Sequence, residues 1–418
     1  MQTLTQLKSG ELVGVNRVKI AENLTTFPSE LYALADTLEI LDLTGNLLSR
    51  LPDDFYKLRK LKILFLSNNQ FDHLPPVLGQ CKQLEMIGFK ANQIQTVAEN
   101  SLPPKTRWLI LTDNRIDALP SSIGRLTRLQ KLMLAGNHLK SLPSAMANCT
   151  NLQLIRLSAN QLTDLPDWLL KLPKLAWLAF AGNPISRCPN PNTFIRKTLP
   201  QASLQDLTFS TQLGEGASGH IYQANWKRPQ SESSETLENL PNPGTNPILA
   251  VKLFKGEVTS DGYPEDELMA CVLAGQHPNL VSMLAEINET EKNDLQKPTG
   301  LVMQCIPESY FNLGLPPCLK SCTRDNFADD FKLDATQVEK IIHQITDVMA
   351  HLHANQLCHG DLYAHNILMD ESANVLLTDF GAASPLWSLP PYQQTLIKNI
   401  EQRALKHLVE DLESLIRI

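Results

Sequence analysis

The sequence predicts an α/β solenoid over residues 1–190, a linker over 191–206 and a separate α+β domain over 207–418. Three observations lead to this prediction. A 23-residue repeat fills the first half, the repeat stops near Pro184, and the second half pairs a glycine-rich segment with two acidic loops far downstream. A chain of 418 residues is also too long for one ordinary core, so at least two domains are expected.

The repeat has the form LxxLxLxxN and occurs in about eight copies. Each copy is expected to form one short strand and one return segment, whose leucines are buried only when neighbours stack. The asparagine side chains would bond backbone groups of adjacent turns. The pattern resembles the leucine-rich-repeat family. Its asparagines follow one another at steps of 22 or 23 residues after a looser copy at Asn23: Asn46, Asn69, Asn92, Asn114, Asn137, Asn160 and Asn183.

The strand positions that face away from the core are mostly apolar, whereas a strand face in contact with solvent is expected to be polar. A contiguous exposed apolar patch usually marks a binding site. We therefore expect a concave surface that binds a protein or peptide partner. Docking of the chain's own second domain, or a register shifted by one residue, are the alternatives. The predicted surface consists of Ile40, Ile63, Phe65, Met86, Trp108, Ile110, Met133, Leu154 and Trp177.

Composition limits the class of protein further. The net charge of −7 argues against a general nucleic-acid binder, which usually carries a basic patch. No apolar run approaches 20 residues and the first residues show no signal pattern, so we expect a cytoplasmic protein without membrane insertion. Eight cysteines in this length do not form a disulfide scaffold.

The second half begins with QLGEGASGHIYQA, in which Gly214, Gly216 and Gly219 stand between strand-forming residues. Glycines here let backbone N–H groups approach phosphate oxygens. The motif alone would also fit a dinucleotide-binding fold, but HIYQANW indicates a second strand where that fold needs a helix. The apolar strand ILAVKLFK then contains Lys252, which is costly there without a charged partner.

Two further segments, CHGDLYAHNILMD and VLLTDFGAA, complete a set of motifs in one order. Together with the glycine loop and the LAVK lysine they resemble the protein-kinase family, in a compact form of bacterial type. Asp361 and Asn366 lie five residues apart, and Asp361 and Asp379 lie 18 apart, as in that family. The resemblance implies a two-lobed α+β fold over residues 207–418, with ATP and Mg²⁺ as cofactors.

The resemblance also implies a role for each matching residue. Lys252 would hold the α- and β-phosphates, paired with Glu267, or with Glu265 as the alternative. Asp361 would orient and deprotonate the acceptor hydroxyl, while two residues would bind magnesium. These are Asn366, which would also serve catalysis, and Asp379.

The nucleotide would be covered by the three glycines together with Ile221. Met303 would lie at the back of the adenine pocket, and Gln304 would open the hinge strand.

Three departures from the family pattern stand out. Gly360 replaces the arginine before the catalytic aspartate, which suggests that activity does not depend on a phosphorylated loop. Tyr363 stands where many serine/threonine kinases carry a lysine near the γ-phosphate. Only 37 residues follow Gly381, so we expect a shortened second lobe in which Glu401 replaces the usual anchoring aspartate.

We therefore predict an ATP-dependent protein kinase, of serine/threonine type, whose repeats recruit a protein substrate or regulator. Two other functions stay open at this point. One is a kinase-fold enzyme that phosphorylates a small molecule, and the other is a repeat scaffold with an inactive, nucleotide-sensing kinase domain.

Overall fold

The computed structural model describes most of the chain. The described residues are 2–187, 199–215, 219–227, 248–255, 258–259, 261–288, 298–319, 321 and 323–417. By their contacts they form two compact units. The first contains Met1–Ile185 together with Pro391–Ile400, and the second contains Ser186–Pro390 together with Glu401–Ile418. The boundaries predicted from the sequence for the domains and the linker stay predictions.

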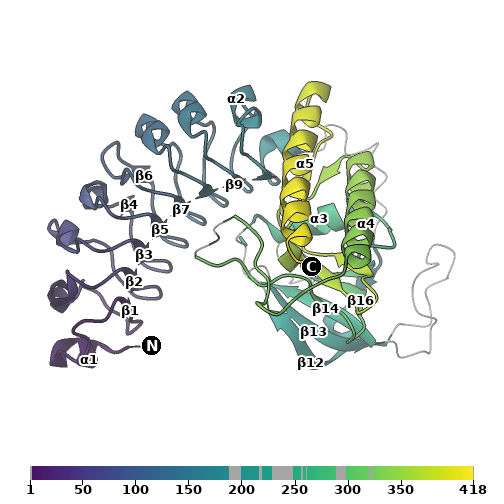
Figure 1. Ribbon diagram of the computed structural model, residues 1–418, viewed down its shortest axis with the longest axis horizontal. Coiled ribbons are helices and arrows are strands. Elements are labelled where there is room, and N and C mark those ends of the chain that lie inside the picture. The colour runs from purple at the N-terminus through teal and green to yellow at the C-terminus, as the bar shows by residue number, and fades with distance from the viewer. Residues whose placement is uncertain are drawn as a thin grey trace. The chain divides into compact units, whose positions relative to one another are not determined.

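The first unit is built on an eight-stranded parallel sheet with one short strand from each repeat (Figure 1). Its order follows the chain without a crossover, as expected when each repeat contacts only its neighbours. The strands are β1 (Arg17–Lys19), β2 (Ile40–Asp42), β3 (Ile63–Phe65), β5 (Met86–Gly88), β7 (Trp108–Ile110), β8 (Lys131–Met133), β9 (Leu154–Arg156) and β10 (Trp177–Ala179).

The register of these strands agrees with the sequence prediction. The central residue of every strand is buried, for example Leu41, Leu64 and Leu132 at 0% exposure, so its two neighbours point to the opposite face. On that opposite face, six of the nine predicted apolar side chains are half-buried, whereas Met86, Leu154 and Trp177 are buried at 2–3% exposure, so the prediction of an exposed surface was wrong for these three. Neighbouring strands of the sheet lie so close together that large side chains of adjacent repeats come into contact. A Cβ at Gly88, for instance, would lie 2.7 Å from the ring of Phe65.

The asparagines form the expected ladder. Asn137 is typical: its Nδ2 donates to the carbonyls of Leu111 at 2.9 Å and Leu134 at 3.0 Å, and its Oδ1 accepts from the Ile116 amide at 3.0 Å. Asn46 makes equivalent bonds at the start of the array. Each side chain therefore satisfies backbone groups of its own turn and of the preceding repeat, in a buried place where unpaired groups would be costly.

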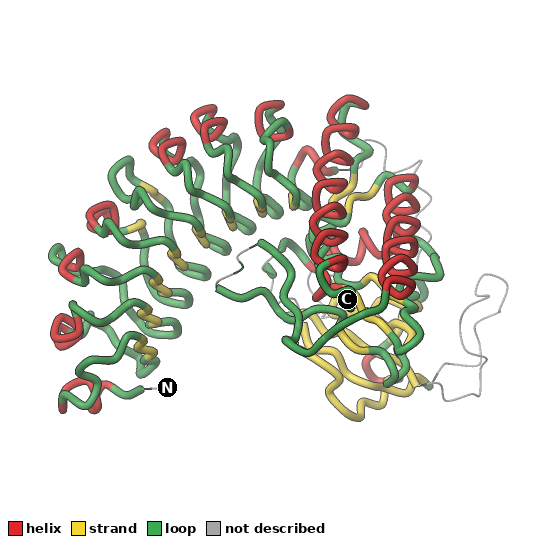
Figure 2. Tube along the Cα trace, viewed as in Figure 1, coloured by secondary structure: helices red, strands yellow, loops and turns green. Residues whose placement is uncertain are grey.

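The return segments are mostly short 3₁₀ helices on the outer side of the array (Figure 2). The first repeat is preceded by a helix that a Thr3–Gln6 capping box begins. The remaining elements are α1 (Leu4–Ser9), η1 (Ser29–Leu34), η2 (Phe55–Lys57), β4 (His73–Leu74), η3 (Pro76–Gln80), β6 (Thr96–Val97), η4 (Ser121–Arg125), η5 (Ser144–Asn148), α2 (Asp167–Leu170) and η6 (Pro184–Ser186).

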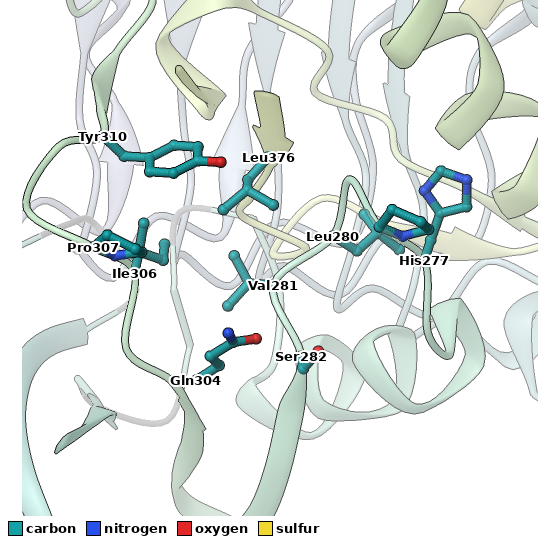
Figure 3. A pocket seen from close by; sticks show the side chains of 10 residues that line it. His277, Leu280, Val281, Ser282, Gln304, Ile306, Pro307, Tyr310 and Leu376 are labelled. Atoms are coloured by element: carbon teal, nitrogen blue, oxygen red, sulfur yellow. The ribbon is translucent and has the colours of Figure 1, made fainter. Parts of the chain in front are cut away.

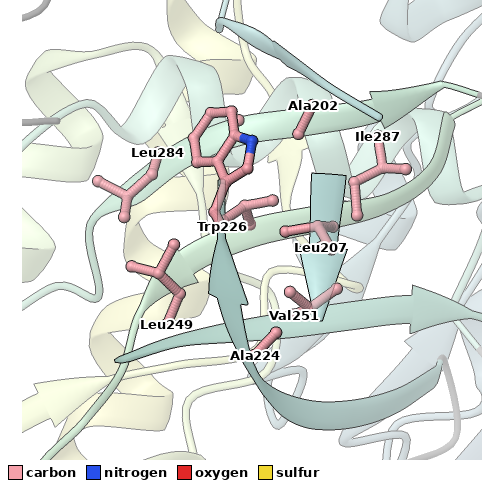
Figure 4. Close-up of a cluster of buried hydrophobic side chains, with 10 residues drawn as sticks. Ala202, Leu207, Ala224, Trp226, Leu249, Val251, Leu284 and Ile287 are labelled. Atoms are coloured by element: carbon pink, nitrogen blue, oxygen red, sulfur yellow. The ribbon is translucent and has the colours of Figure 1, made fainter. Parts of the chain in front are cut away.

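The second unit begins with a six-stranded sheet in the order β11-β15-β16-β14-β13-β12. One face carries a hydrophobic core centred on Trp226, Val251 and Ile287 (Figure 4). The elements are β11 (Gln201–Ala202), η7 (Leu204–Asp206), β12 (Leu207–Glu215), β13 (Gly219–Trp226), β14 (Ile248–Phe254), α3 (Pro264–Ala274), β15 (Met283–Asn288) and β16 (Pro298–Gln304).

Two long helices dominate the rest of this unit, the second of which belongs to it only from Glu401 onward. Helix α4 starts with a capping box between Asp334 and Gln337, and its buried residues follow the helical period. The elements are β17 (Phe311–Asn312), α4 (Ala335–Ala354), β18 (Leu357–Cys358), η8 (Ala364–Asn366), β19 (Ile367–Met369), β20 (Val375–Leu377), β21 (Ser384–Pro385) and α5 (Pro391–Glu413).

Helix α5 contributes to both units. In its first turns, Gln393 Nε2 donates to the Leu165 carbonyl at 3.0 Å and the Tyr392 hydroxyl donates to Asp167 at 3.0 Å. These residues belong to the repeat unit, whereas the helix from Glu401 onward belongs to the second unit. Within the described part of the chain, no helix is both long and apolar enough for a membrane span.

Candidate active site

The sheet brings the glycine-rich strand and the predicted phosphate-binding lysine into one row. Gly214 of β12 pairs with Ile221 of β13, which pairs with Lys252 of β14. Directly opposite residues share one face of a sheet. A Cβ at Gly219 would lie 2.4 Å from a backbone oxygen of β14, so only glycine permits this approach. Gly216 lies outside the described residues.

Lys252 forms an ion pair with Glu267 on α3, at 9% and 4% exposure respectively. The structure thus pairs the lysine with the first of the two acidic candidates and not with Glu265. Burial acts to lower the pKa of Lys252, but the charges of Glu267 and Asp379 outweigh it and the pKa is raised. The side chain therefore stays an ammonium, suited to phosphate oxygens.

Asp361 and Asn366 are in direct contact. The Asn366 amide donates to the Asp361 carboxylate and to its carbonyl, both at 2.9 Å. The buried ring of His359 connects this loop to the next one: its Nδ1 accepts from the Asp361 amide at 3.3 Å, and its Nε2 lies 3.1 Å from the Thr378 carbonyl. Because a carbonyl oxygen can only accept, His359 donates to Thr378 through Nε2. The ring thus joins the loop of Asp361 to the loop of Thr378.

Asp379 follows Thr378 and has a φ of 60°, in the left-handed region that non-glycine residues seldom adopt. Its carboxylate accepts from the Gly381 amide at 3.1 Å. Such conformations persist where the surrounding structure enforces them, and they concentrate at functional sites. The backbone thereby presents the Asp379 carboxylate, which is exposed, close enough to Lys252 to influence its pKa.

The oxygen groups of Asn366 and Asp379 fit a magnesium ion. Among the described residues, no three or more His, Cys, Asp or Glu side chains gather as a metal site. Magnesium commonly takes only one or two protein carboxylates and completes its shell with phosphate oxygens and water. Asn366 and Asp379, with the Lys252 ammonium near Asp379, would therefore make a donor set of the kind that a magnesium–nucleotide complex requires.

The loop before Asp361 is held by Glu401 of α5. Its carboxylate accepts from the Gly360 amide at 2.8 Å and contacts His353 at 2.6 Å. Gly360 itself has a φ of 73°. The glycine that replaces the family's usual arginine therefore has a conformational reason that the sequence did not reveal, because a side chain would be strained there.

Sequence reasoning missed a second carboxylate at this loop. Asp325 accepts a hydrogen bond from the Ala364 amide at 2.8 Å. It precedes α4 in a polar segment without a motif, and it lies 39 residues from its partner. Nothing in the local sequence marks it.

A pocket of about 330 Å³ lies beside the end of β16 (Figure 3). Gln304, Ile306 and Leu376 line it, whereas Lys252 and Asp361 do not. Met303 is buried within β16. Gln304 thus lines a pocket whose lining includes neither Lys252 nor Asp361, and the predicted contacts of Met303 and Gln304 with adenine stay predictions.

Comparison with known families agrees with this geometry. A model described as protein tyrosine and serine/threonine kinase matches residues 207–402, and a leucine rich repeat model matches residues 36–94, 104–162 and 127–185. The chain contains leucine-rich repeats followed by a protein kinase domain. The match supports a phosphotransferase. It does not distinguish tyrosine from serine or threonine as the residue that accepts the phosphoryl group.

Individual relatives give the same result. The chain is 25% identical to fibroblast growth factor receptor 1 of Xenopus laevis over 193 residues, 45% of this chain and 22% of that protein. It is 25% identical to the serine/threonine-protein kinase PITSLRE of Drosophila melanogaster over 204 residues, 48% of this chain and 18% of that protein. A dual specificity protein kinase of Dictyostelium discoideum is 28% identical over 138 residues, 33% of this chain and 9% of that protein.

Among solved structures, an LRR protein of Leptospira interrogans matches 44% of this chain and 53% of its own, with 25% identity and a TM-score of 0.37.

Proposed function

We propose that this chain transfers the γ-phosphoryl group of ATP to serine or threonine hydroxyls of a protein, and that its repeats recruit that protein or a regulator. The observation that carries the proposal is the combination of a buried Lys252–Glu267 ion pair with the contacting pair Asp361 and Asn366. Kinase catalysis depends on positioning and on neutralising phosphate charge, and these groups supply both.

In this proposal each side chain has one task. Lys252, oriented by Glu267, binds phosphate oxygens as a fixed positive charge. Asp361 accepts the proton of the acceptor hydroxyl, and its contact with Asn366 fixes the direction of its carboxylate. Asn366 and Asp379 would hold magnesium, which neutralises charge on the phosphates when bound.

The test uses the purified full chain with radiolabelled ATP, magnesium and a generic protein acceptor. We expect label on protein, located on serine or threonine by phosphoamino-acid analysis, and its loss in Asp361→Asn. The matched control is Asp330→Asn, an exposed aspartate of the same domain, which should label as the wild type does. Label on tyrosine would overturn the acceptor assignment.

Absence of label on protein, in a folded chain that binds ATP, would overturn protein phosphorylation. A metabolite panel would then separate the two remaining functions. Label on a small molecule would favour the small-molecule kinase, for which Tyr363 in place of a charged lysine is the supporting departure. No transfer at all would favour the nucleotide-sensing scaffold.

The recruitment role rests on the apolar character of the outward strand face. Ile63 and Ile110 are half-buried there, and Trp108 carries Lys131 over its ring at 4.7 Å. We expect Ile63→Asp and Ile110→Asp to raise the KM for a recruited protein substrate by about tenfold, since burying a charge at an interface is costly, with the KM for ATP unchanged. An unchanged protein KM would contradict recruitment through this face.

A further inference from the structure

The catalytic loop is hydrogen-bonded on both sides of Asp361 to carboxylates from distant parts of the chain. On one side Glu401 accepts from the Gly360 amide at 2.8 Å. On the other side Asp325 accepts from the Ala364 amide, also at 2.8 Å. The proposed catalytic residue therefore lies between two backbone amides that are each fixed by a side-chain oxygen.

The Ala364 amide needs an external acceptor. Ala364 begins the short helix η8, where the first backbone donors have no partner within the helix. The preceding residue, Tyr363, makes no side-chain cap to this helix, and Ala364 is fully buried. Asp325 supplies the missing cap from 39 residues away. The same short helix contains Asn366, the partner of Asp361.

Asp325 is itself held rigidly. Its own amide lies 3.3 Å from Asp411 Oδ2, and the neighbouring Arg324 donates through Nε to that carboxylate at 2.9 Å. Arg324 also donates to the His407 carbonyl at 3.3 Å. The segment is therefore tied to the C-terminal turns of α5, the helix that also carries Glu401.

A second backbone contact fixes the same loop position. The Gly314 amide donates to the Ala364 carbonyl at 3.1 Å, and a Cβ on Gly314 would lie 2.7 Å from that of Ala364. Just beyond, the Leu315 amide donates to the Asn326 carbonyl at 2.7 Å. Asn326, which follows Asp325, is thus bonded to the same segment that contacts the catalytic loop through Gly314.

We propose that Asp325 is a positioning residue for phosphoryl transfer, a second anchor that holds the catalytic loop through the Ala364 amide. The inference rests on the proposed function, because it gives Asp325 its effect through Asp361 and Asn366. Asp325 touches neither substrate nor cofactor. Its action is to keep η8, and with it the Asp361–Asn366 contact, in one geometry.

The anchor works as a hydrogen-bond acceptor in either protonation state. Burial raises the pKa of Asp325 to about 7, the bond from Ala364 lowers it, the charges of Asp411 and Asp361 raise it, and Arg324 lowers it. A protonated carboxyl still offers its carbonyl oxygen to an amide. An asparagine should therefore replace Asp325 far better than an alanine does.

The experiment compares Asp325→Ala, Asp325→Asn and the exposed control Asp330→Ala in the full chain. We expect Asp325→Ala to lower kcat by about tenfold or more, as loss of loop geometry does, with the KM for ATP within about twofold. Asp325→Asn should keep most of the activity and Asp330→Ala all of it. Wild-type kcat in Asp325→Ala, or equal damage in Asp325→Asn, would overturn the proposal.

A second readout does not need activity. Hydrogen exchange of the peptide that spans Gly360–Asn366 should be faster in Asp325→Ala and unchanged in Asp330→Ala. Unchanged exchange in Asp325→Ala would overturn the anchor. If the wild type transfers no phosphate, the proposed function fails, while the exchange result still decides whether Asp325 holds the loop.

A double variant covers the case in which Asp325→Ala does not fold. Adding Ala364→Pro removes the backbone N–H that lost its acceptor, and proline is tolerated at the first position of a helix. The preceding Tyr363 has φ −136° and ψ 153°, which is compatible with a following proline. We expect the double variant to fold and to recover kcat to within about threefold of the wild type. A double variant as impaired as the single one would overturn the proposal.

Discussion

The first unit, which contains the repeats (the repeat unit), and the second unit, which contains the kinase domain (the catalytic unit), satisfy buried polar groups in different ways. In the repeats, one asparagine per turn satisfies backbone groups at sequence separations of about one repeat, such as 22 and 26 residues for Asn46. In the catalytic unit, single contacts span 15 residues for Lys252–Glu267, 39 for Ala364–Asp325 and 41 for Gly360–Glu401. The ladder repeats and is readable from a period, whereas each catalytic contact occurs once.

This difference predicts where a single substitution is tolerated. Loss of one rung removes one of several equivalent contacts and should reduce stability. Loss of a catalytic contact has no equivalent elsewhere and should reduce activity. The following predictions test that contrast, in order of decreasing effect.

Asp361→Asn should have the largest effect. Loss of the proposed general base is expected to lower turnover by about 10³-fold, while the isosteric side chain keeps the loop near its present shape. Steady-state phosphorylation and thermal unfolding measure the two properties separately. Turnover like that of the wild type would show that Asp361 is not the base.

Lys252→Met should reduce both activity and stability. It leaves Glu267 buried without its partner, which is expected to cost about 3–5 kcal/mol in the free energy of unfolding, and it removes the proposed phosphate contact. Chemical denaturation and kinase assays measure the two effects. The double variant Lys252→Met/Glu267→Leu should regain stability without activity; a double variant that is as unstable as the single one would contradict this account.

Asn137→Ala should reduce stability through the loss of one rung. It leaves the Ile116 amide and two carbonyls without their side-chain partner, at a cost of about 2–4 kcal/mol. Asn151→Ala is the matched control, because Asn151 bonds only at an exposed position, and it should change stability by less than about 0.5 kcal/mol. Equal effects of the two substitutions would show that the ladder does not stabilise the array.

The smallest effect concerns pH. Burial raises the pKa of Asp325 from 3.8 to about 7, so the folded state binds this proton more tightly than the unfolded state does. Its contribution to stability is therefore complete below pH 4 and is lost as the pH rises through about 7. Asp325→Asn removes this dependence. The unfolding temperature of the wild type should fall relative to that of the variant between pH 5 and pH 8, and parallel curves would contradict it.

Sequence reasoning reached furthest where a rule repeats or a motif is dense. The period located the eight strands of the main solenoid sheet and the buried central residue of each, because every repeat meets the same neighbours; the short pair β4 and β6 was not predicted. The motifs also singled out Glu267 as the partner of Lys252, since a buried lysine requires a nearby acid. These features depend on local pattern and on chemistry that each residue carries by itself.

Other features had no local signal. The left-handed φ of Gly360, the half-buried apolar strand face and the grouping of Pro391–Ile400 with the repeats appear only in three dimensions. The same holds for Asp325, whose role as the acceptor for the Ala364 amide is visible only in the folded chain.

The sequence by itself therefore determined the solenoid, the kinase domain and the identity of the chemical groups, because periodic burial and charged motifs are properties of the residues in order. Only the tertiary structure decided how the catalytic loop is held. That depends on unique hydrogen bonds from Glu401 and Asp325 to backbone amides far away in the chain, and backbone amides are the same at every position.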